Sequence, residues 1–243
     1  MSAQWRYLTM INYSVDREIL DPLVPRGCEL DLWNDQAYVS LVGFRFLDTR
    51  LKGIPIPFHR DFDEINLRFY VRRKDHENET DGDWKRAVAF VKEIVPKRAI
   101  ALTARLFYNE PYIAVPTRHV IKMDVGSGEK ANRIVRYGWK FRGKWNSISV
   151  RPVGDPNALT DGSEEQFIAE HYWGYTAQKD GGTLEYQVTH PAWRVWSCVD
   201  PQIEINVAEL YGSQFETALR QTPTSAFLAE GSDVSVSNGR RVE

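Results

Sequence analysis

One face of a single strand-like stretch carries the side chains best suited to chemistry. Residues 62–73 (FDEINLRFYVRR) alternate polar and apolar side chains, which is the pattern of a β-strand. Glu64, Asn66 and Arg68 fall on one face of this strand. If that face lines a cavity, Arg68 can bind an acid group through two parallel hydrogen bonds and Glu64 can act as a general base. The alternative is a solvated outer face with cross-strand pairs, and the strand alone does not choose between the two.

A second candidate lies at the turn that ends a predicted helix. A helix of about three turns is predicted from Pro96 onward, because apolar residues recur at helical spacing. Asn109 can adopt the left-handed conformation that ends helices, and Pro111 prevents the helix from continuing. Tyr108 and Tyr112 flank this turn. In one interpretation, both side chains pack against the helix end as ordinary aromatic residues. In the other, Tyr112 donates a hydrogen bond to a ligand and acts as a general acid.

The histidines and cysteines show no spacing typical of a metal site. The five histidines form no H-x-H or H-E-x-x-H motif. His171 lies near the end of a helix predicted over residues 163–173, where the helix dipole favours a structural role. We keep His171 as a candidate substrate-binding residue as well. Cys28 and Cys198 form neither a ligand cluster nor a disulfide framework, so the sequence predicts no metal.

Two further motifs are set aside. Residues 126–131 (GSGEKA) fit the G-x-G-x-x-A pattern of dinucleotide sites, but a strand-like stretch follows where such a site needs a helix. Residues 130–154 carry seven basic side chains and no acidic one. Strand alternation places these charges on both faces, which favours a solvated hairpin over a nucleic-acid surface. We therefore expect no cofactor and no nucleic-acid partner.

The composition is that of a globular chain with a small net charge. The chain has 243 residues, 42% of them hydrophobic, and a formal net charge of −2, so neither nucleic acid nor an anionic membrane is favoured as a partner. The N-terminus has no apolar run long enough for a signal peptide, and no stretch approaches a membrane span. Together with the two unclustered cysteines, these features predict a cytoplasmic protein without a membrane partner.

The periodicity of the chain predicts ten strands and three to four helices. The strands cover residues 5–13, 37–46, 62–73, 87–95, 118–125, 133–141, 144–152, 183–190, 194–199 and 232–236. Helices are predicted over residues 17–23, from Pro96, over 163–173 behind a capping box and ended by Gly174, and over 206–219 behind Asn206. No repeat or linker divides the chain. The fold class is therefore α+β and sheet-dominated: residues 1–243 form one domain, expected to be a closed or half-closed β-barrel with three to four flanking helices.

Several motifs together resemble the YqjF-like family of uncharacterised bacterial proteins. The resemblance covers nearly the whole chain, and it is specific because many short motifs occur together. The motifs are the run over residues 5–46, then 66–71 (NLRFYV), 110–112 (EPY), 170–175 (EHYWGY), 185–186 (EY), 190–193 (HPAW) and 225–232 (SAFLAEGS). That family is similar, more weakly, to the acetoacetate decarboxylase-like superfamily, whose members are single-domain β-barrels with a buried pocket.

The resemblance implies roles for three positions. In the decarboxylase, a lysine that follows a turn forms a Schiff base with a β-keto acid. The turn matches residues 109–111 of this chain, and Tyr112 stands at the lysine position, where a phenol cannot form an imine. Glu64 resembles a glutamate of the pocket, and Arg6, ten residues before Asp16, resembles an arginine near the substrate carboxylate. The resemblance thus implies the scaffold and part of the polar lining, without the amine.

Two hypotheses of different class follow. In the first, the chain is a lyase-like enzyme for a small acidic or carbonyl-containing molecule and works without an imine. An arginine then binds a carboxylate, Glu64 transfers a proton and Tyr112 stabilises an oxyanion. In the second, the chain is a non-catalytic binding protein that has kept the pocket and lost the lysine. Both hypotheses need a small-molecule partner, and the oligomeric state stays open, a homo-oligomer included. The predicted site residues are Glu64 and Tyr112 as catalytic groups and Arg6, Arg68, Tyr108 and His171 as substrate-binding groups.

Overall fold

The fold is a large sheet with a few short helices. The computed structural model describes residues 1–55, 57–75, 84–123 and 133–242, whose 15 strands form one sheet. The α+β, sheet-dominated class predicted from the sequence is confirmed. The strands are β1 (Ser2–Val15), β2 (Glu29–Leu30), β3 (Ala37–Leu51), β4 (Ile54–Pro55), β5 (Phe62–Lys74), β6 (Trp84–Val95), β7 (Tyr112–Ala114), β8 (Thr117–Lys122), β9 (Ile134–Phe141), β10 (Lys144–Ala158), β11 (Trp173–Ala177), β12 (Thr183–Thr189), β13 (Arg194–Glu204), β14 (Ser225–Val236) and β15 (Arg240–Val242). The helices are α1 (Arg17–Leu20), α2 (Arg98–Phe107), α3 (Glu164–Ala169), α4 (Val207–Leu210) and α5 (Glu216–Leu219), with 3₁₀ turns at Asp21–Leu23 and Ser213–Phe215.

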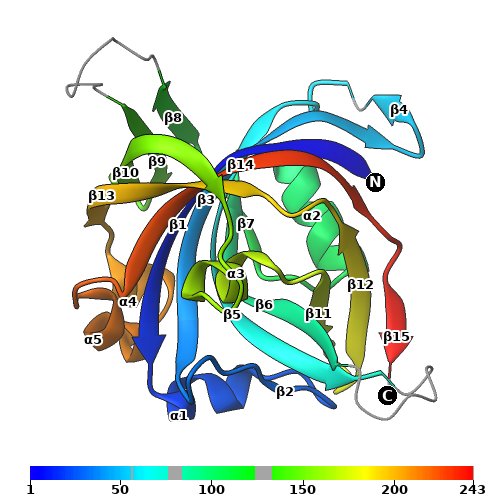
Figure 1. The fold of residues 1–243 in the computed structure, drawn as a ribbon. Coiled ribbons are helices and arrows are strands. Elements are labelled where there is room, and N and C mark those ends of the chain that lie inside the picture. Colours follow the sequence, from blue (N-terminus) through cyan, green and yellow to red (C-terminus); the bar gives the residue numbers. More distant parts are fainter. Residues whose placement is uncertain (56, 76–83, 124–132, 243) are drawn as a thin grey trace.

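Seven of the strands pair in a ring. Neighbours are hydrogen-bonded in the order β12, β11, β6, β5, β3, β1 and β14, and β14 pairs with β12 again through Val236 and Val188. From β14 the sheet continues through β13, β10 and β9 to β8. In Figure 1 helix α3 lies in the middle of the view, framed by strands of the ring, and α4 and α5 lie outside these strands at the lower left. The strands of the ring therefore have two faces with different neighbours.

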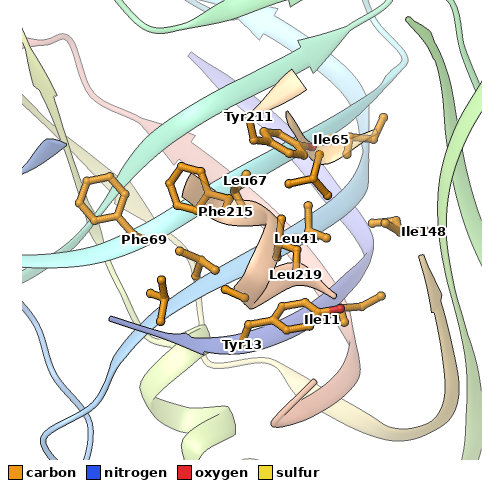
Figure 2. Close-up of a cluster of buried hydrophobic side chains, with 14 of the residues drawn as sticks. Ile11, Tyr13, Leu41, Ile65, Leu67, Phe69, Ile148, Tyr211, Phe215 and Leu219 are labelled. Carbon is orange, nitrogen blue, oxygen red and sulfur yellow. The ribbon is translucent and has the colours of Figure 1, made fainter. Parts of the chain in front are cut away.

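One face of β5 packs into a large hydrophobic cluster. Ile65, Leu67 and Phe69 are at most 1% exposed and belong to a cluster with side chains from β9, β10 and the α4–α5 segment. Figure 2 shows them with Tyr211 and Leu219 of that segment. Complete burial of a Leu, Ile or Phe side chain stabilises the fold by about 1.5–3 kcal/mol. A slip of one residue would remove these side chains from the cluster, so this face fixes the register of β5.

The opposite face of β5, called the Glu64 face from here on, is also buried. Glu64 is 3% exposed, Asn66 2% and Tyr70 1%. Tyr70 belongs to a second hydrophobic cluster, which includes Phe167 and Ile168 of α3. The sequence left open whether this face is solvated or enclosed, and the structure shows that it is enclosed. Water is therefore not freely available to its polar side chains, which need partners inside the molecule.

The ten predicted strands occur where they were expected, and several extend further. Strand β3 is buried on both faces from Ala37 to Phe44, as its two apolar faces predict. Strand β13 continues to Glu204, and β14 already begins at Ser225 instead of residue 232. The short strands β2, β4, β7, β11 and β15 were not counted among the predicted strands, because so few residues give no periodic signal.

The helix predicted over residues 163–173 begins where expected but ends too late in the prediction. Its start is confirmed, since Ser163 Oγ accepts a hydrogen bond from the Gln166 backbone N–H at 3.1 Å. The helix stops at Ala169, however, and Trp173 already begins β11. Gly174 therefore lies inside a strand and does not end a helix.

Two other helix boundaries also differ from the prediction. The segment 206–219 is not one helix but α4, a 3₁₀ turn and α5, because Gly212 adopts a φ of 107°, which no helix contains. Asn206 caps α4 as predicted, accepting from the Glu209 backbone N–H at 3.4 Å. Helix α2 begins at Arg98 behind Lys97 as N-cap, so Pro96 precedes the helix instead of starting it.

Some of the sequence motifs lie outside the described residues. These are the G-x-G-x-x-A match at residues 126–131 and the last two residues of the strand predicted over 118–125. Among the helices that the structure describes, none combines the length and apolar character needed to cross a membrane.

Candidate functional site

Three glutamates gather on the Glu64 face. The strand register places Asn66 of β5 opposite Glu93 of β6, and Glu93 opposite Tyr112 of β7. Glu64 precedes Asn66 by two residues and therefore shares its face. Glu110 lies in the loop before β7, and its charge raises the pKa values of both Glu64 and Glu93. We call Glu64, Glu93 and Glu110 the glutamate cluster.

The turn after α2 positions one member of the cluster, Glu110, and also Tyr112. Asn109 adopts a φ of 56°, the left-handed conformation that its position predicts. Its side-chain Nδ2 donates to a backbone carbonyl of β11 at 2.8 Å, which ties the turn to the ring. Pro111 prevents the helix from continuing, and Tyr112 begins β7. Glu110, which lies between Asn109 and Pro111, is only 7% exposed.

Glu64 accepts two hydrogen bonds inside the protein. Tyr112 OH donates to Glu64 Oε2 at 3.0 Å, and Asn66 Nδ2 donates to Oε1 at 3.2 Å. Burial raises the pKa of Glu64 to about 8, and the nearby Glu110 raises it too, while the two hydrogen bonds oppose this shift. Glu64 therefore carries a proton at pH 7. A protonated carboxyl still accepts hydrogen bonds and also has one O–H to donate.

Glu110 is held by two hydroxyl groups. Tyr186 OH donates to Glu110 Oε1 at 2.6 Å and Thr176 Oγ1 at 3.4 Å. Burial raises the pKa of Glu110 to about 7, although both hydrogen bonds lower it. The Tyr186 ring reaches this position by lying against Gly174, where a Cβ would stand 2.2 Å from Tyr186 Cζ. A residue with a Cβ at position 174 would push the ring away from Glu110.

Glu93 is the least satisfied member of the cluster. It is 1% exposed, and burial together with the charges of Glu110 and Glu64 raises its pKa well above the usual range. Its Oε2 is buried without a hydrogen-bond partner among the described residues, and so is Asn66 Oδ1. Burial also raises the pKa of Tyr112 and Tyr186 well above the usual range, so both phenols stay neutral donors. Two polar atoms of the cluster and its surroundings thus lack a hydrogen-bond partner among the described residues.

Arg68 lies at the other end of the Glu64 face. Its Nη2 donates to the Ile168 carbonyl at 3.0 Å and its Nε to Tyr70 OH at 3.3 Å. Tyr70 OH in turn lies 2.5 Å from Ser40 Oγ. Arg68 is four positions after Glu64, which corresponds to about 13 Å along the strand. The structure therefore does not bring Arg68 to the glutamate cluster.

His171 lies at the Arg68 end of the Glu64 face, and it lies outside the helix in which it was predicted. Because α3 ends at Ala169, His171 is not in a last helical turn and the dipole argument is wrong. His171 Nε2 lies 3.2 Å from Asp31 Oδ2, which also accepts from Arg86 Nε at 2.7 Å. Burial lowers the pKa of His171 to about 4, so its imidazole is neutral at pH 7. We call Asp31, Arg68, Arg86 and His171 the arginine cluster.

The remaining two predicted residues have other neighbours. Arg6 Nη1 donates to the Gly231 carbonyl at 2.9 Å, and its guanidinium lies 3.9 Å from Asp233 with 33% of the side chain exposed. The Tyr108 ring packs edge-on against Tyr186, with 5.9 Å between the ring centroids. Of the six predicted residues, Glu64 and Tyr112 are in direct contact. Tyr108 reaches the glutamate cluster only through Tyr186.

Sequence reasoning missed two acidic residues that matter here. Glu93 is the single acidic residue of the stretch 87–95 (AVAFVKEIV), in which Lys92 is the only other charged residue, and a carboxyl inside a predicted buried strand was the available signal. Asp31, which pairs with both His171 and Arg86, gave no comparable signal, because it follows a two-residue strand. Glu110 was noted only as part of the turn.

A groove of about 560 Å³ lies elsewhere on the molecule, between β13 and the α4–α5 segment. Its lining includes Tyr13, Ile203, Val207, Leu219 and Pro223, and none of the predicted site residues. The pocket expected beside Tyr112 stays a prediction.

Comparison with known proteins identifies a family. The model of DUF2071, a family of uncharacterized conserved proteins, matches residues 2–233. The chain is 28% identical to the uncharacterized protein YqjF of Bacillus subtilis strain 168 over 211 residues, which is 85% of this chain and 78% of YqjF. The resemblance to the YqjF-like family is therefore confirmed.

Solved structures are similar at the level of the fold. Acetoacetate decarboxylase from Legionella pneumophila superposes with a TM-score of 0.67 at 13% identity, covering 100% of this chain and 87% of the decarboxylase. The enduracididine biosynthesis enzyme MppR, in its complex with pyruvate, gives a TM-score of 0.66 at 10% identity, covering 100% of this chain and 90% of MppR. At these identities the similarity shows a common fold, that of the acetoacetate decarboxylase-like proteins.

Proposed function

This chain belongs to the DUF2071 family, and from its glutamate cluster we propose that it is an enzyme that removes and returns a proton of a small carbonyl compound through an enolate intermediate, without an imine. The proposal includes a closed β-barrel formed by the ring of strands, a single domain over residues 1–243, and a pocket beside Tyr112. The pairing of β14 with β12 supports the closure, since it joins the two ends of the ring.

The observation that carries the proposal is the contact between Tyr112 and a protonated Glu64, at 3.0 Å. A neutral carboxylic acid beside a phenol is the arrangement that ketosteroid isomerase uses to stabilise an enolate oxygen. The Glu64 O–H would donate to the carbonyl oxygen of the ligand, while Tyr112 holds the carboxyl in place. Donors that are already oriented in a buried site stabilise developing negative charge strongly, because no water competes for them.

Glu110 is the proposed base. With a pKa of about 7 it is ionised in a large fraction of molecules near neutral pH and still binds a proton readily. Its carboxylate takes a proton from the carbon next to the ligand carbonyl, and the electron pair of that C–H bond moves to the carbonyl oxygen. The enolate oxygen then takes the hydrogen bond from Glu64. Return of the proton to the same or another carbon completes the reaction.

An imine route is not part of the proposal. It requires a lysine amine, and the position that the resemblance assigns to this lysine holds Tyr112. The raised pKa of the Tyr112 phenol makes it a hydrogen-bond donor and not a nucleophile. Treatment with acetoacetate or pyruvate and borohydride is expected to leave no covalent adduct, and a stable adduct would overturn this part of the proposal.

The electrostatics favour a carbonyl group over an acid group as the part of the ligand that meets the cluster. A ligand carboxylate at the cluster would add a like charge beside the ionised Glu110 in a buried site. The expected carboxylate-binding residue, Arg68, lies at the far end of the Glu64 face and already donates to Ile168 and Tyr70. The ligand is therefore proposed to be recognised through its carbonyl oxygen.

A non-catalytic binding protein is the second candidate function. The observation that favours it is Tyr112 itself, since the group that would perform the chemistry of the decarboxylase is absent from its position. Such a protein would use the Glu64 and Tyr112 hydroxyls to bind a carbonyl oxygen and would transfer no proton.

Hydrogen–deuterium exchange separates the two candidates. In D₂O at pH 7, the protein is expected to accelerate loss of the α-proton signals of hydroxyacetone in ¹H NMR spectra. Glu64→Leu, which removes the proposed donor, should lower this rate at least tenfold, since loss of one such donor costs roughly 10²–10³ in rate. Tyr112→Phe should lower the rate as well, because it removes the hydrogen bond that holds the Glu64 carboxyl. Arg6→Ala serves as the control, because Arg6 contacts β14 and not the cluster. Binding without exchange would contradict the enzyme proposal and support the binding protein.

A further inference from the structure

The glutamate cluster contains acceptors that nothing in the described structure satisfies. Hydroxyl or amide donors reach Glu64 and Glu110, yet Glu93 Oε2 and Asn66 Oδ1 remain buried without a partner there. These two side chains lie directly opposite each other on β6 and β5 and are 1% and 2% exposed. A buried acceptor without a donor costs about 1–3 kcal/mol. Two adjacent acceptors of this kind indicate that a hydrogen-bond donor from outside the chain binds beside Asn66 and Glu93.

The cluster also lacks a positive charge. In the ranges that the structure describes, no lysine, arginine or histidine nitrogen forms an ion pair with Glu64, Glu93 or Glu110, whereas other buried acids have cations. Glu185 is 1% exposed and pairs with Arg240 at 2.8 Å and Lys85 at 3.6 Å. Burying a carboxylate without a counter-charge is unfavourable enough that it takes up a proton instead. Protons therefore neutralise most of the cluster near neutral pH, with Glu110 ionised in part, until a cation replaces them.

We propose that this cluster binds the positively charged nitrogen of its ligand, which makes the ligand class a small carbonyl compound that carries an ammonium group, such as an aminoketone. This inference rests on the proposed function, because it uses the same site. An ammonium has three N–H donors and no acceptor, which is the complement of Glu93 Oε2, Asn66 Oδ1 and an ionised carboxylate. Its charge also offsets the carboxylates that it meets.

The geometry favours an organic cation over a metal ion. Among the described side chains, no three His, Cys, Asp or Glu residues come together closely enough to hold one metal ion. An aminoketone distributes its contacts, because the ammonium and the carbonyl oxygen lie at different ends of the molecule. The ammonium would lie with Glu93 and Asn66, and the carbonyl oxygen would meet Glu64, two residues from Asn66 on the same face of β5.

Binding of such a cation has a proton signature. When the ammonium enters, Glu93 and Glu110 give up protons to the solvent, so binding is expected to release protons and to strengthen as the pH rises from 6 to 8. The ionised neighbours then keep Glu64 protonated and able to donate its O–H.

The test compares aminoacetone with hydroxyacetone, which has nearly the same shape and no charge. Isothermal titration calorimetry at pH 7.5, in two buffers of different ionisation enthalpy, gives the affinity and the number of protons released. We expect aminoacetone to bind at least tenfold more tightly, with proton release. Glu93→Gln should reduce this preference at least tenfold, whereas Glu209→Gln, on the exposed surface of α4, should keep it.

The outcomes separate this inference from the proposed function. A preference for aminoacetone without α-proton exchange would support the cation site and contradict the enzyme. Exchange without a preference for aminoacetone, or a preference that Glu93→Gln leaves unchanged, would overturn the cation site. Glu93→Gln is nearly isosteric, and a thermal melt of the variant shows whether it is folded before its affinity is interpreted.

Discussion

Strand β5 carries two buried polar regions on one face, and they are satisfied in opposite ways. At the Arg68 end, Asp31 accepts from both Arg86 and His171, and Arg68 donates to Ile168 and Tyr70. At the Glu64 end, three carboxyl groups are buried with hydroxyl and amide donors and no ion pair among the described residues. The arginine cluster thus contains an ion pair between Asp31 and the partly exposed Arg86, whereas the more deeply buried glutamate cluster has no counter-charge among the described residues.

The arginine cluster has the properties of a structural network. Burial by itself raises the pKa of Asp31, but the hydrogen bonds and charge of its partners outweigh this and hold it below its usual range. With His171 neutral, the Arg86 guanidinium is the positive charge that faces Asp31. Arg86 pairs with Asp31. Arg68 donates to the Ile168 carbonyl and to Tyr70, and His171 Nδ1 is buried without a partner among the described residues. The cluster connects β6 to the segments that carry Asp31 and His171.

The glutamate cluster has the properties of a site. Its carboxyls have raised pKa values and two of its acceptors are unpartnered, which reduces the stability of the folded chain. Groups with strongly shifted pKa values in a buried position are candidates for function, because stability alone does not favour them. From the difference between the clusters we propose that one end of the face serves the fold and the other end binds a ligand.

The largest expected effect contrasts one acid from each cluster. Asp31→Asn removes the charge that pairs with Arg86 and His171, and should destabilise the protein by about 3 kcal/mol. Glu93→Gln replaces an acid that must be protonated to be buried, and should stabilise it by about 1 kcal/mol at pH 7. Urea denaturation of both variants and the wild type measures the two values. Changes of the same sign would remove the distinction between the clusters.

The pH dependence of stability should have opposite sign at the two ends. The folded-state pKa of Glu64, about 8, is above its ordinary value of 4.5. Its contribution to the free energy of unfolding is therefore complete below about pH 4.5 and is lost, by several kcal/mol, as the pH rises toward 8. His171 has a folded-state pKa of about 4, below its ordinary 6.5. Its contribution is present above about pH 6.5 and is lost as the pH falls toward 4.

Variants isolate these two slopes. Relative to the wild type, Glu64→Gln should gain stability as the pH rises from 5 to 8, and His171→Gln should gain stability as the pH falls from 6.5 to 4. Urea midpoints measured over this pH range check both. If the stability difference between Glu64→Gln and the wild type did not change from pH 5 to pH 8, Glu64 would be ionised in the folded protein.

Gly174→Ala tests how the glutamate cluster is packed. The new methyl group would overlap the Tyr186 ring, and we expect a loss of about 2 kcal/mol. Displacing Tyr186 OH also removes a hydrogen bond that lowers the pKa of Glu110, so that pKa should rise further above 7. Thermal denaturation, combined with Tyr186→Leu in a double-mutant cycle, measures the coupling. Additive effects of the two substitutions would contradict this contact.

Tyr112→Phe is expected to have the smallest effect on stability, about 1 kcal/mol, since it removes one hydrogen bond and retains the ring. It should also raise the pKa of Glu64, because the lost bond lowers it. Arg6→Ala is the matched control. Its ion pair with Asp233 is long and largely exposed, so the change should stay within about 0.5 kcal/mol. If Tyr112→Phe and Arg6→Ala changed the pKa of Glu64 equally, the contact between Tyr112 and Glu64 would be contradicted.

Local sequence signals predicted much of this arrangement. Alternation along 62–73 correctly placed Glu64, Asn66 and Arg68 on one face, and Asn109 with Pro111 correctly marked the end of α2. These features depend only on neighbouring residues. The capping box at Ser163 likewise marked the start of α3, but it carries no information on where the helix ends, and the helix-dipole argument for His171 failed for that reason.

The composition of the glutamate cluster could not be predicted from local signals. The row formed by Asn66, Glu93 and Tyr112 depends on the register of three strands, which the sequence of each strand alone does not fix. The contact of Tyr186 with Glu110 depends on Gly174, whose role changes from helix stop to close contact once β11 and β12 are paired. Long-range pairing therefore decided which acids meet.

The protonation of Glu64 and Glu110 tests the central claim most directly. Side-chain carboxyl signals of ¹³C-labelled glutamate can be followed by NMR from pH 3 to pH 9 and assigned with Glu64→Gln and Glu110→Gln. We expect one signal to titrate with a midpoint near pH 8 and one near pH 7, each missing from the corresponding variant. Titration of all glutamate signals near pH 4.5 would contradict the account, since the buried cluster would then be ionised and would need a cation from the protein itself.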